Sequence, residues 1–274
     1  MLNHASFGAV PLQVQKVQRD YQDRWMCHAD AWYFGGKLEE SMLDAARVVG
    51  EHIGAKEEEV CLLGNATDAT ITILHRWNRK LQESSSSSSV ISLNYAYRAN
   101  KIALGYYIEP HADVIFTEVP FPYRSFDSSF FPTVLENLER DLRKHRPRYA
   151  LLEHIHSQPA ICLPIKDMVQ LCRDYGVEEI AVDGAHGVGS IPDLDVPSIG
   201  ADFYYSNLHK WGSYLSPFPY LSALFFKQTP YRFQPPHINR SICTRRYDEI
   251  DHTSDRVLVT WYGFEKRISV YRNT

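Results

Sequence analysis

The sequence lacks an excess of positive charge, a long apolar run and any paired cysteine motif. Its 274 residues carry 29 lysines and arginines against 33 aspartates and glutamates, a formal net charge of −4, whereas a nucleic-acid surface needs concentrated positive charge. No run is long and apolar enough to cross a bilayer, and the first residues lack the basic start and apolar core of a secretory signal. We therefore expect neither a nucleic-acid partner nor a membrane partner.

The five cysteines are scattered, odd in number and never in a CxxC pair. This pattern is typical of reduced thiols, so we predict a cytoplasmic protein without a disulfide framework or a zinc site. The histidines show no ligand spacing either, so we predict no structural metal. Cys162 and Cys172 lie in apolar patterns and are expected in the core.

Short apolar runs alternate with longer helical patterns, which predicts a mainly parallel sheet with helices on both faces. The length allows one large α/β domain, alone or with a small one. Apolar periodicity predicts helices over residues 43–53, 67–81, 97–107, 133–144 and 166–175. Seven strands are predicted, over residues 60–64, 90–94, 114–119, 149–155, 178–183, 201–205 and 221–226. The expected fold is thus a three-layer α/β/α domain around a seven-stranded sheet.

Asp183 and Lys210 each follow a predicted apolar strand, and one short crossover separates them. A pyridoxal phosphate enzyme requires this pair, because a carboxylate keeps the pyridine nitrogen protonated and a lysine amine forms the Schiff base. Taken alone, Asp183 could be a helix cap or turn residue, and Lys210 could lie over the ring of Trp211. Together they predict pyridoxal 5'-phosphate as the cofactor.

A candidate phosphate site follows the first predicted strand, where Asn65-Ala66-Thr67 opens a helix. Ligands of open parallel sheets bind beyond the carboxyl ends of the strands. Backbone N–H groups at a helix N-terminus and the Thr67 hydroxyl could hold a phosphate there. The alternative is an ordinary helix N-cap made by Asn65 or Thr67.

Candidate ring contacts follow two more strands. Tyr95 or Tyr97 could stack on a cofactor ring, with Ala185 as the small residue on the opposite face. The sequence does not choose between the two tyrosines. Ser157 or His186 could hydrogen-bond the phenolic oxygen of the cofactor.

These motifs carry a family resemblance. Residues 65–67, 182–189 and 206–211 resemble the fold-type I, class V aminotransferase family. Residues 2–9 and 31–34 are similar to its isopenicillin N epimerase-like branch. Within that branch, residues 157–166 and 200–211 most resemble plant L-cysteine desulfhydrases and ergothioneine-pathway C–S lyases. The likeness covers residues 1 to about 230 of the chain.

The resemblance implies the pyridoxal-phosphate-dependent transferase fold, a homodimer and a role for several residues. Lys210 would carry the cofactor, Asp183 would pair with its ring nitrogen, and His186 would lie near its phenolic oxygen. The other implied contacts are Ala185 on the ring, Ala66, Thr67, Asn207 and His209 on the phosphate, Thr253 on the phosphate of a partner subunit, and Asn3 and His4 near the substrate.

Two features depart from the family pattern. The loop over residues 212–219 is longer than that of the family, and the chain ends where relatives continue as a small domain that supplies an arginine for the substrate carboxylate. Residues 267–273 resemble that arginine motif, which makes Arg267 a candidate substrate ligand. As the origin of this similarity, we favour chance over an internal deletion that brought the motif forward. The expected division is an N-terminal arm over 1–25, a cofactor-binding large domain over 26–235 and a truncated small-domain remnant over 236–274.

The resemblance implies an enzyme, a carbon–sulfur lyase that converts L-cysteine or a cysteine derivative into pyruvate, ammonia and sulfide. The same residues would serve an amino-acid epimerase. A cysteine desulfurase would need an activated cysteine near the site, and Cys243 has basic neighbours but lacks the family's motif. A truncated, non-catalytic homologue is the remaining alternative.

Overall fold

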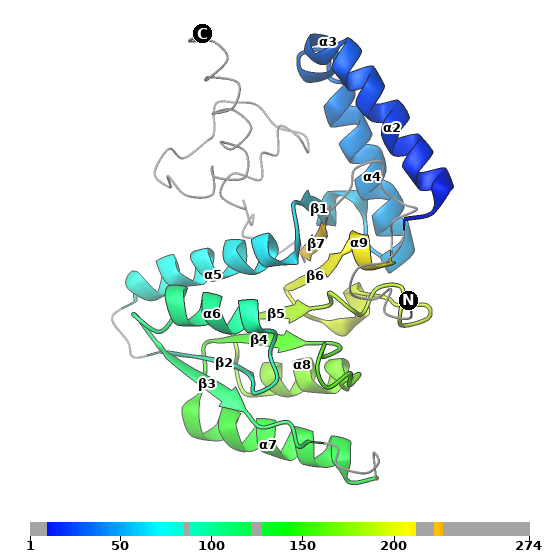
Figure 1. Ribbon diagram of the computed structural model, residues 1–274. Coiled ribbons are helices and arrows are strands. Elements are labelled where there is room, and N and C mark those ends of the chain that lie inside the picture. The colour runs from blue at the N-terminus through cyan, green and yellow to red at the C-terminus, as the bar shows by residue number, and fades with distance from the viewer. Residues whose placement is uncertain (1–9, 85–87, 122–127, 212–221, 227–274) are drawn as a thin grey trace.

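A seven-stranded sheet forms the centre of the molecule (Figure 1). The computed structural model describes residues 10–84, 88–121, 128–211 and 222–226. The strand order is β1-β7-β6-β5-β4-β2-β3, and in the described sheet β7 alone runs in the opposite direction to the other strands. The strands are β1 (Val60–Leu63), β2 (Ser89–Leu93), β3 (Asp113–Thr117), β4 (Tyr149–Glu153), β5 (Glu179–Asp183), β6 (Phe203–Asn207) and β7 (Ser222–Phe226). The predicted seven-stranded, mainly parallel sheet is confirmed.

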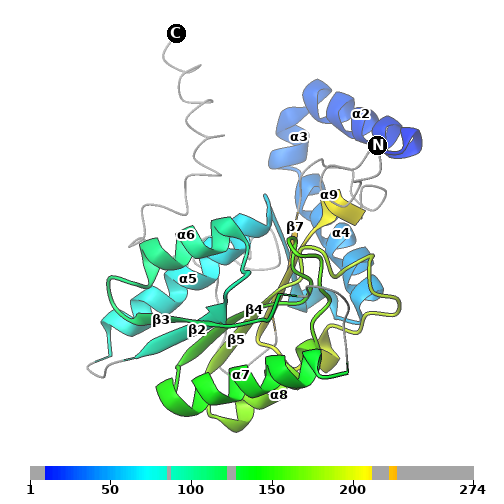
Figure 2. The ribbon, with the colours of Figure 1, turned by 60° about the horizontal axis from the view of Figure 1, so that its bottom comes forward.

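Helices cover both faces of the sheet, which confirms the three predicted layers (Figure 2). On one face pack α5 (Ala66–Gln82) and α6 (Arg98–Tyr107), and their apolar side chains share a core cluster. The other core cluster lies against α4 (Lys37–Ile53), α7 (Phe130–His145) and α8 (Ile165–Asp174). Because both faces are covered, β2, β4 and β6 are buried along their whole length, as expected for a parallel sheet. Short helical turns are η1 (Glu57–Glu59), η2 (Pro197–Ile199) and α9 (Leu208–Trp211).

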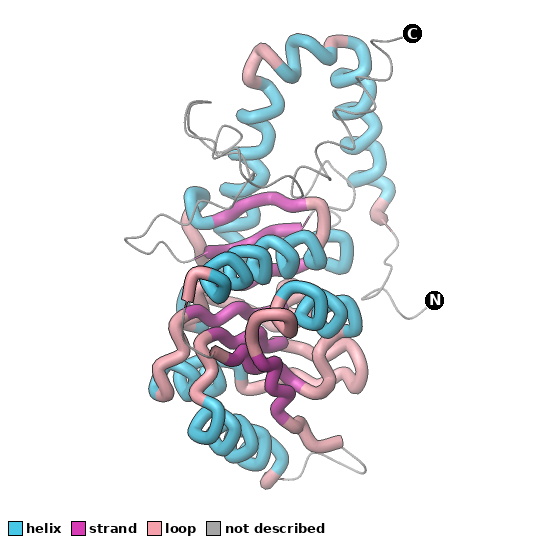
Figure 3. The backbone as a smooth tube through the Cα atoms, turned by 90° about the vertical axis from the view of Figure 1, so that its left-hand side faces the viewer, coloured by secondary structure: helices cyan, strands magenta, loops and turns pink. Residues whose placement is uncertain are grey.

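Two helices that the sequence did not predict precede α4. Figures 1 and 3 show α2 (Leu12–Cys27) and α3 (Ala29–Tyr33) standing away from the sheet. Val14 is the one buried residue of α2, so the helix needs no continuous apolar face and its sequence shows only weak apolar periodicity. Its first turn also has no side-chain cap. The predicted division into an arm, a large domain and a remnant stays a prediction.

The two cysteines expected in the core have different surroundings. Cys172 is fully buried in α8, which confirms the prediction. For Cys162 the prediction is wrong, because this side chain is exposed. Its neighbours Ile161 and Leu163 are buried, and the segment forms an antiparallel bridge to Ile155. Successive side chains of an extended segment point to opposite sides, so the residue between two buried neighbours faces outward.

The described residues contain no helix that is both long and apolar enough to span a bilayer. The same ranges contain no cluster of three or more side chains suited to a metal ion.

Trp77 joins α5 to the middle of the sheet. Its ring stacks on Tyr149 of β4 with 5.0 Å between centroids and 5° between planes, and both residues are fully buried. Its indole N–H donates to Glu179 Oε2 at 2.9 Å. Arg76 and Lys80 pair with the same carboxylate, so one half-buried anion of β5 binds side chains from two successive turns of α5.

Replacing Trp77 with alanine should lower the free energy of unfolding by about 3–5 kcal/mol, because it leaves a large cavity in the core. Trp77→Phe keeps an aromatic ring on Tyr149 and loses the indole hydrogen bond, so it should cost about 1–2 kcal/mol. Urea unfolding of the three proteins measures both effects. Equal losses for the two variants would show that stability depends on the hydrogen bond and not on the stacked ring.

Candidate active site

The candidate residues of five different strands meet at one edge of the sheet. Strands β2, β4, β5 and β6 are parallel, and two antiparallel steps through β7 give β1 the same direction as β6. The carboxyl ends of all these strands therefore lie at the same edge. The segments that leave this edge are residues 64–67, 94–97, 154–157, 184–186 and 208–210.

Asp183, the last residue of β5, is buried at this edge with 6% of its surface exposed. Its Oδ1 accepts the backbone N–H of Ala185 at 2.9 Å, and its Oδ2 accepts the side-chain amide of Asn100 at 2.7 Å. Burial, and secondarily the negative charge of Glu153, raise the pKa of Asp183 to about 6 in spite of these hydrogen bonds. The site thus contains a more basic carboxylate than an exposed aspartate.

Lys210 lies in α9, directly after β6, and its Nζ is 3.0 Å from Nε2 of His186. Burial lowers the pKa of the Lys210 amine, while the charges of Asp183 and Glu153 oppose that shift. Burial and the charge of Lys210 lower the pKa of His186 to about 4, so this imidazole is neutral near pH 7. The structure therefore brings Lys210, His186 and Asp183 into one electrostatically connected group.

The N-terminus of α5 lies beside the end of β6. Asn207 Oδ1 accepts the backbone N–H of Ala66 at 3.0 Å, which links the two strand ends across β7. Asn65 Oδ1 accepts the N–H of Asp68 at 2.9 Å, so Asn65 is a helix N-cap, as the alternative interpretation expected. Thr67 is half-buried in the first turn. The positive end of the helix dipole faces this edge of the sheet, and the phosphate role of these residues stays a prediction.

The two candidate tyrosines differ in exposure. Tyr95 is half-buried, with its ring edge-on to His156 at 6.0 Å and tilted against Phe121 at 6.3 Å. Tyr97 is 52% exposed, and its backbone N–H donates to Glu153. The structure places both at the site and does not choose the ring contact.

The structure describes some predicted site residues and not others. Ala185 is buried beside Asp183, while Ser157 and His209 are half-buried at the same edge. Asn3, His4, Cys243, Thr253 and Arg267 lie outside the described residues.

Sequence reasoning missed Glu153, His156 and Asn100. Glu153 ends the apolar strand β4 as Asp183 ends β5, so the same strand-end signal was present. Asn100 shares the buried face of α6 with Ala103 and Leu104, and a polar residue in an apolar stripe was its signal.

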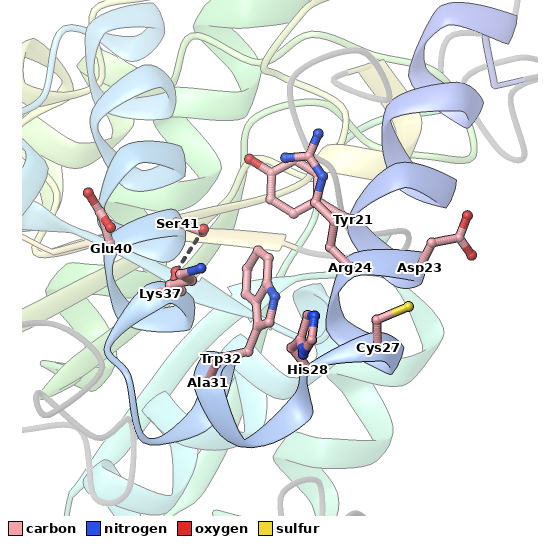
Figure 4. A pocket seen from close by; sticks show the side chains of 10 residues that line it. All are labelled: Tyr21, Asp23, Arg24, Cys27, His28, Ala31, Trp32, Lys37, Glu40 and Ser41. Carbon is pink, nitrogen blue, oxygen red and sulfur yellow. Dashed lines mark hydrogen bonds between the residues drawn. The ribbon is translucent and has the colours of Figure 1, made fainter.

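A separate hollow of about 550 Å³ lies among α2, α3 and α4 (Figure 4). Tyr21 and Trp32, which line it, meet edge-on with 5.8 Å between ring centroids, and Arg24 and Lys37 line it as well. It contains none of the predicted site residues.

The chain belongs to the aminotransferase class-V family, whose model matches residues 5–217. It is 36% identical over 216 residues to a probable chloroplastic L-cysteine desulfhydrase of Arabidopsis thaliana, covering 77% of this chain and 45% of that protein. It is 28% identical over 221 residues to a hercynylcysteine sulfoxide lyase of Schizosaccharomyces pombe, covering 77% and 50%. The chain thus spans about half the length of these relatives.

Solved structures share the fold. The cystine C–S lyase C-DES, in complex with its reaction product cysteine persulfide, superposes with a TM-score of 0.67 at 15% identity, over 82% of this chain and 56% of that one. A cysteine desulfurase from Thermococcus onnurineus gives 0.66 at 14% identity, over 82% and 53%. At these identities the likeness supports the fold alone. The predicted family and the predicted fold class are confirmed.

The turn after β5 packs directly on Tyr204. A Cβ atom at Gly184 would lie 2.0 Å from Cζ of the Tyr204 ring, and one at Gly187 would lie 2.2 Å from its hydroxyl oxygen. Tyr204 is buried, and its hydroxyl is 3.1 Å from Nδ1 of His154. The position of Ala185 and His186 thus depends on two glycines that admit this ring.

Gly184→Ala should destabilise the chain by about 1–3 kcal/mol, because the added methyl forces the turn away from Tyr204. Combining it with Tyr204→Leu should cost less than the sum of the two single changes, since the smaller side chain relieves the contact. A double-mutant cycle of urea unfolding measures this coupling. Additive losses would contradict the direct contact.

Asp183→Asn should change how stability depends on pH. Folding raises the pKa of Asp183 from 3.8 to about 6, so the folded chain binds this proton more tightly than the unfolded chain does. The contribution is therefore present below about pH 4 and lost as the pH rises through about 6. Relative to the variant, the wild type should lose on the order of 3 kcal/mol across that window. Parallel stability curves for the two proteins would contradict the raised pKa.

Proposed function

We propose that this chain is the cofactor-binding part of a pyridoxal-phosphate-dependent carbon–sulfur lyase that acts on L-cysteine or a cysteine derivative. One observation carries the proposal: the half-buried Lys210 amine lies 3.0 Å from His186 and interacts electrostatically with buried Asp183. The names of the relatives, L-cysteine desulfhydrase and hercynylcysteine sulfoxide lyase, support this reaction class. The net charge of −4 supports a small-molecule substrate over a nucleic acid.

The residues present fit the cofactor. A pyridoxal phosphate site needs an amine for the aldehyde, an anion for the ring nitrogen and donors for the phosphate. Lys210 and Asp183 supply the first two. Donors for the phosphate would come from the first turn of α5, with Thr67, and from the Asn207–His209 segment.

The proposed reaction converts L-cysteine and water into pyruvate, ammonia and hydrogen sulfide. The Cα–H and Cβ–S bonds break, the sulfur leaves with the bonding pair, and water hydrolyses the released enamine. When bound, the cofactor ring supplies the electron sink that makes loss of the Cα proton feasible.

Lys210 would move the proton. Its Nζ would accept the proton of the substrate Cα, and burial favours the neutral amine that this step needs. His186, neutral near pH 7, would hold the amine through Nε2 and lie near the phenolic oxygen. Asp183 would keep a proton on the ring nitrogen, since two hydrogen bonds fix its carboxylate.

Substrate contacts are proposed for residues beyond the described ranges. Asn3 and His4 would approach the amino acid, and Arg267 is the candidate for its carboxylate. Ser157, in the segment that follows β4, is the second candidate for the phenolic oxygen. Tyr95 and Tyr97 are the candidates for ring stacking.

A homodimer is part of the proposal, with Thr253 of one subunit completing the phosphate site of the other. Ile102 and Tyr106 support it, because these apolar side chains of α6 are 62% and 61% exposed, and exposed apolar patches often mark interfaces. Light scattering of the purified chain should give twice the monomer mass, and a monomer would contradict the dimer.

We propose the cytoplasm as the compartment. In the part of the chain that the structure describes, Cys27, Cys61, Cys162 and Cys172 form no disulfide, which fits a reducing compartment. A relative is named chloroplastic, so a fluorescent fusion of the full gene product decides between cytoplasm and plastid.

Lys210→Ala should abolish both the visible absorbance of bound cofactor and the release of sulfide from L-cysteine, because no other group can replace the amine. Lys144→Ala, which removes an exposed lysine of α7, is the matched control and should keep both. Spectra with added cofactor and a sulfide assay measure the two effects.

Two further measurements, the configuration of the recovered amino acid and the amount of persulfide on the protein, separate the competing functions when combined with the spectrum and the sulfide assay. Bound cofactor with racemised amino acid and no sulfide would favour an epimerase, and persulfide on the protein would favour a desulfurase. Absence of bound cofactor in the wild type would favour a non-catalytic homologue and would contradict the proposal.

A further inference from the structure

A second buried carboxylate, that of Glu153, lies beside Asp183 on the neighbouring strand. Glu153 ends β4 next to Asp183 in the sheet register, and only 3% of its surface is exposed. Its Oε1 accepts the backbone N–H of Tyr97, and its Oε2 contacts Nδ1 of His156. No step proposed so far uses this side chain.

The amide of Asn100 connects the two carboxylates. Its Nδ2 donates to Asp183 Oδ2 at 2.7 Å and lies 3.5 Å from Glu153 Oε1. Its Oδ1 is 2.9 Å from the hydroxyl of Thr70, which also contacts the Tyr205 hydroxyl at 2.8 Å. This arrangement turns both N–H bonds of the amide towards the carboxylates, so Glu153 and Asp183 hold Asn100 from two sides.

His156 contacts the other oxygen of the Glu153 carboxylate through Nδ1. It is fully buried, and its Nε2 has no hydrogen-bond partner among the described residues. An imidazole whose described polar contact is to Glu153 acts on the site through that carboxylate.

Keeping two carboxylates around one amide is costly, since like charges in a buried space repel and each loses its hydration. The carbonyl oxygen of a neutral glutamine at position 153 would accept the N–H groups of Tyr97 and Asn100 without that cost. The negative charge therefore needs a reason beyond hydrogen bonding. The titratable groups that face Glu153 are Asp183 on β5, His156 after β4, Tyr205 on β6 and Lys210 on α9.

We propose that Glu153, held by His156 and linked to Asp183 through Asn100, is a positioning residue that stabilises the proton on the ring nitrogen of the cofactor. A cationic ring nitrogen beside Asp183 feels both negative charges, so the second one extends the pH range over which the nitrogen keeps its proton. The inference rests on the cofactor of the proposed function and not on the reaction that follows.

The test uses the cofactor-loaded protein with nitrogen-15 in the pyridine ring, whose NMR shift reports protonation directly. In Glu153→Gln the pH at which half of the label loses its proton should fall by about one unit or more, because one negative charge is removed. Glu153→Asp keeps the charge and should restore most of the shift. Glu178→Gln, at an exposed residue just before β5, is the matched control and should leave the ring nitrogen unchanged.

Equal titration of the label in the wild type and Glu153→Gln, including retention of the proton throughout, would overturn the inference. If Glu153→Gln does not fold, Asn100→Ser removes the link between Glu153 and Asp183 and should also lower the pH at which half of the label loses its proton. An unchanged half-titration pH in Asn100→Ser would likewise overturn the inference. Failure of the wild type to bind the label overturns the proposed function as well. If the cofactor binds and sulfide is released normally while the half-titration pH of the label is unchanged in the variants, this inference is wrong and the proposed function stands.

Discussion

The buried carboxylate of Asp183 is the constraint around which this edge of the sheet is arranged. A charge with 6% exposure needs hydrogen bonds, and these come from the turn after β5 and from Asn100 on α6. Satisfying one carboxylate thus fixes the conformation of the 184–187 turn and the position of a helix from elsewhere in the chain. The remaining cost is expressed as the raised pKa of Asp183, which makes its carboxylate a better partner for a cation.

Sheet topology brings the other parts of the site to that carboxylate. Because β7 is antiparallel to both β6 and β1, the N-terminus of α5 lies at the same edge as Lys210. The hydrogen bond from Ala66 to Asn207 then joins segments 141 residues apart. A helix N-terminus, an amine and a carboxylate are held by the rigid sheet, and the geometry does not depend on a long loop.

The sequence was informative where a polar residue follows an apolar strand. Asp183 and Lys210 were found in this way, because the end of a buried strand and the chemistry of the side chain point to the same conclusion. Glu153 carried the same signal but was overlooked, since its importance comes from Asn100, a helix residue that reaches it only in the folded chain. The prediction for Cys162 was wrong and α2 was missed for the same reason. In both, tertiary contacts decide which side of the segment packs against the rest of the chain. The roles of Asn3, His4, Thr253 and Arg267 stay predictions.

The place of β7 in the sheet also governs the order of assembly during translation. Strand β1 is synthesised first, yet its partner in the described sheet is β7, which ends at Phe226. Until the ribosome has delivered that segment, β1 has no strand to pair with, and an open strand edge invites association with other chains. A nascent chain paused before residue 222 would therefore depend on chaperones more than one released a few residues later.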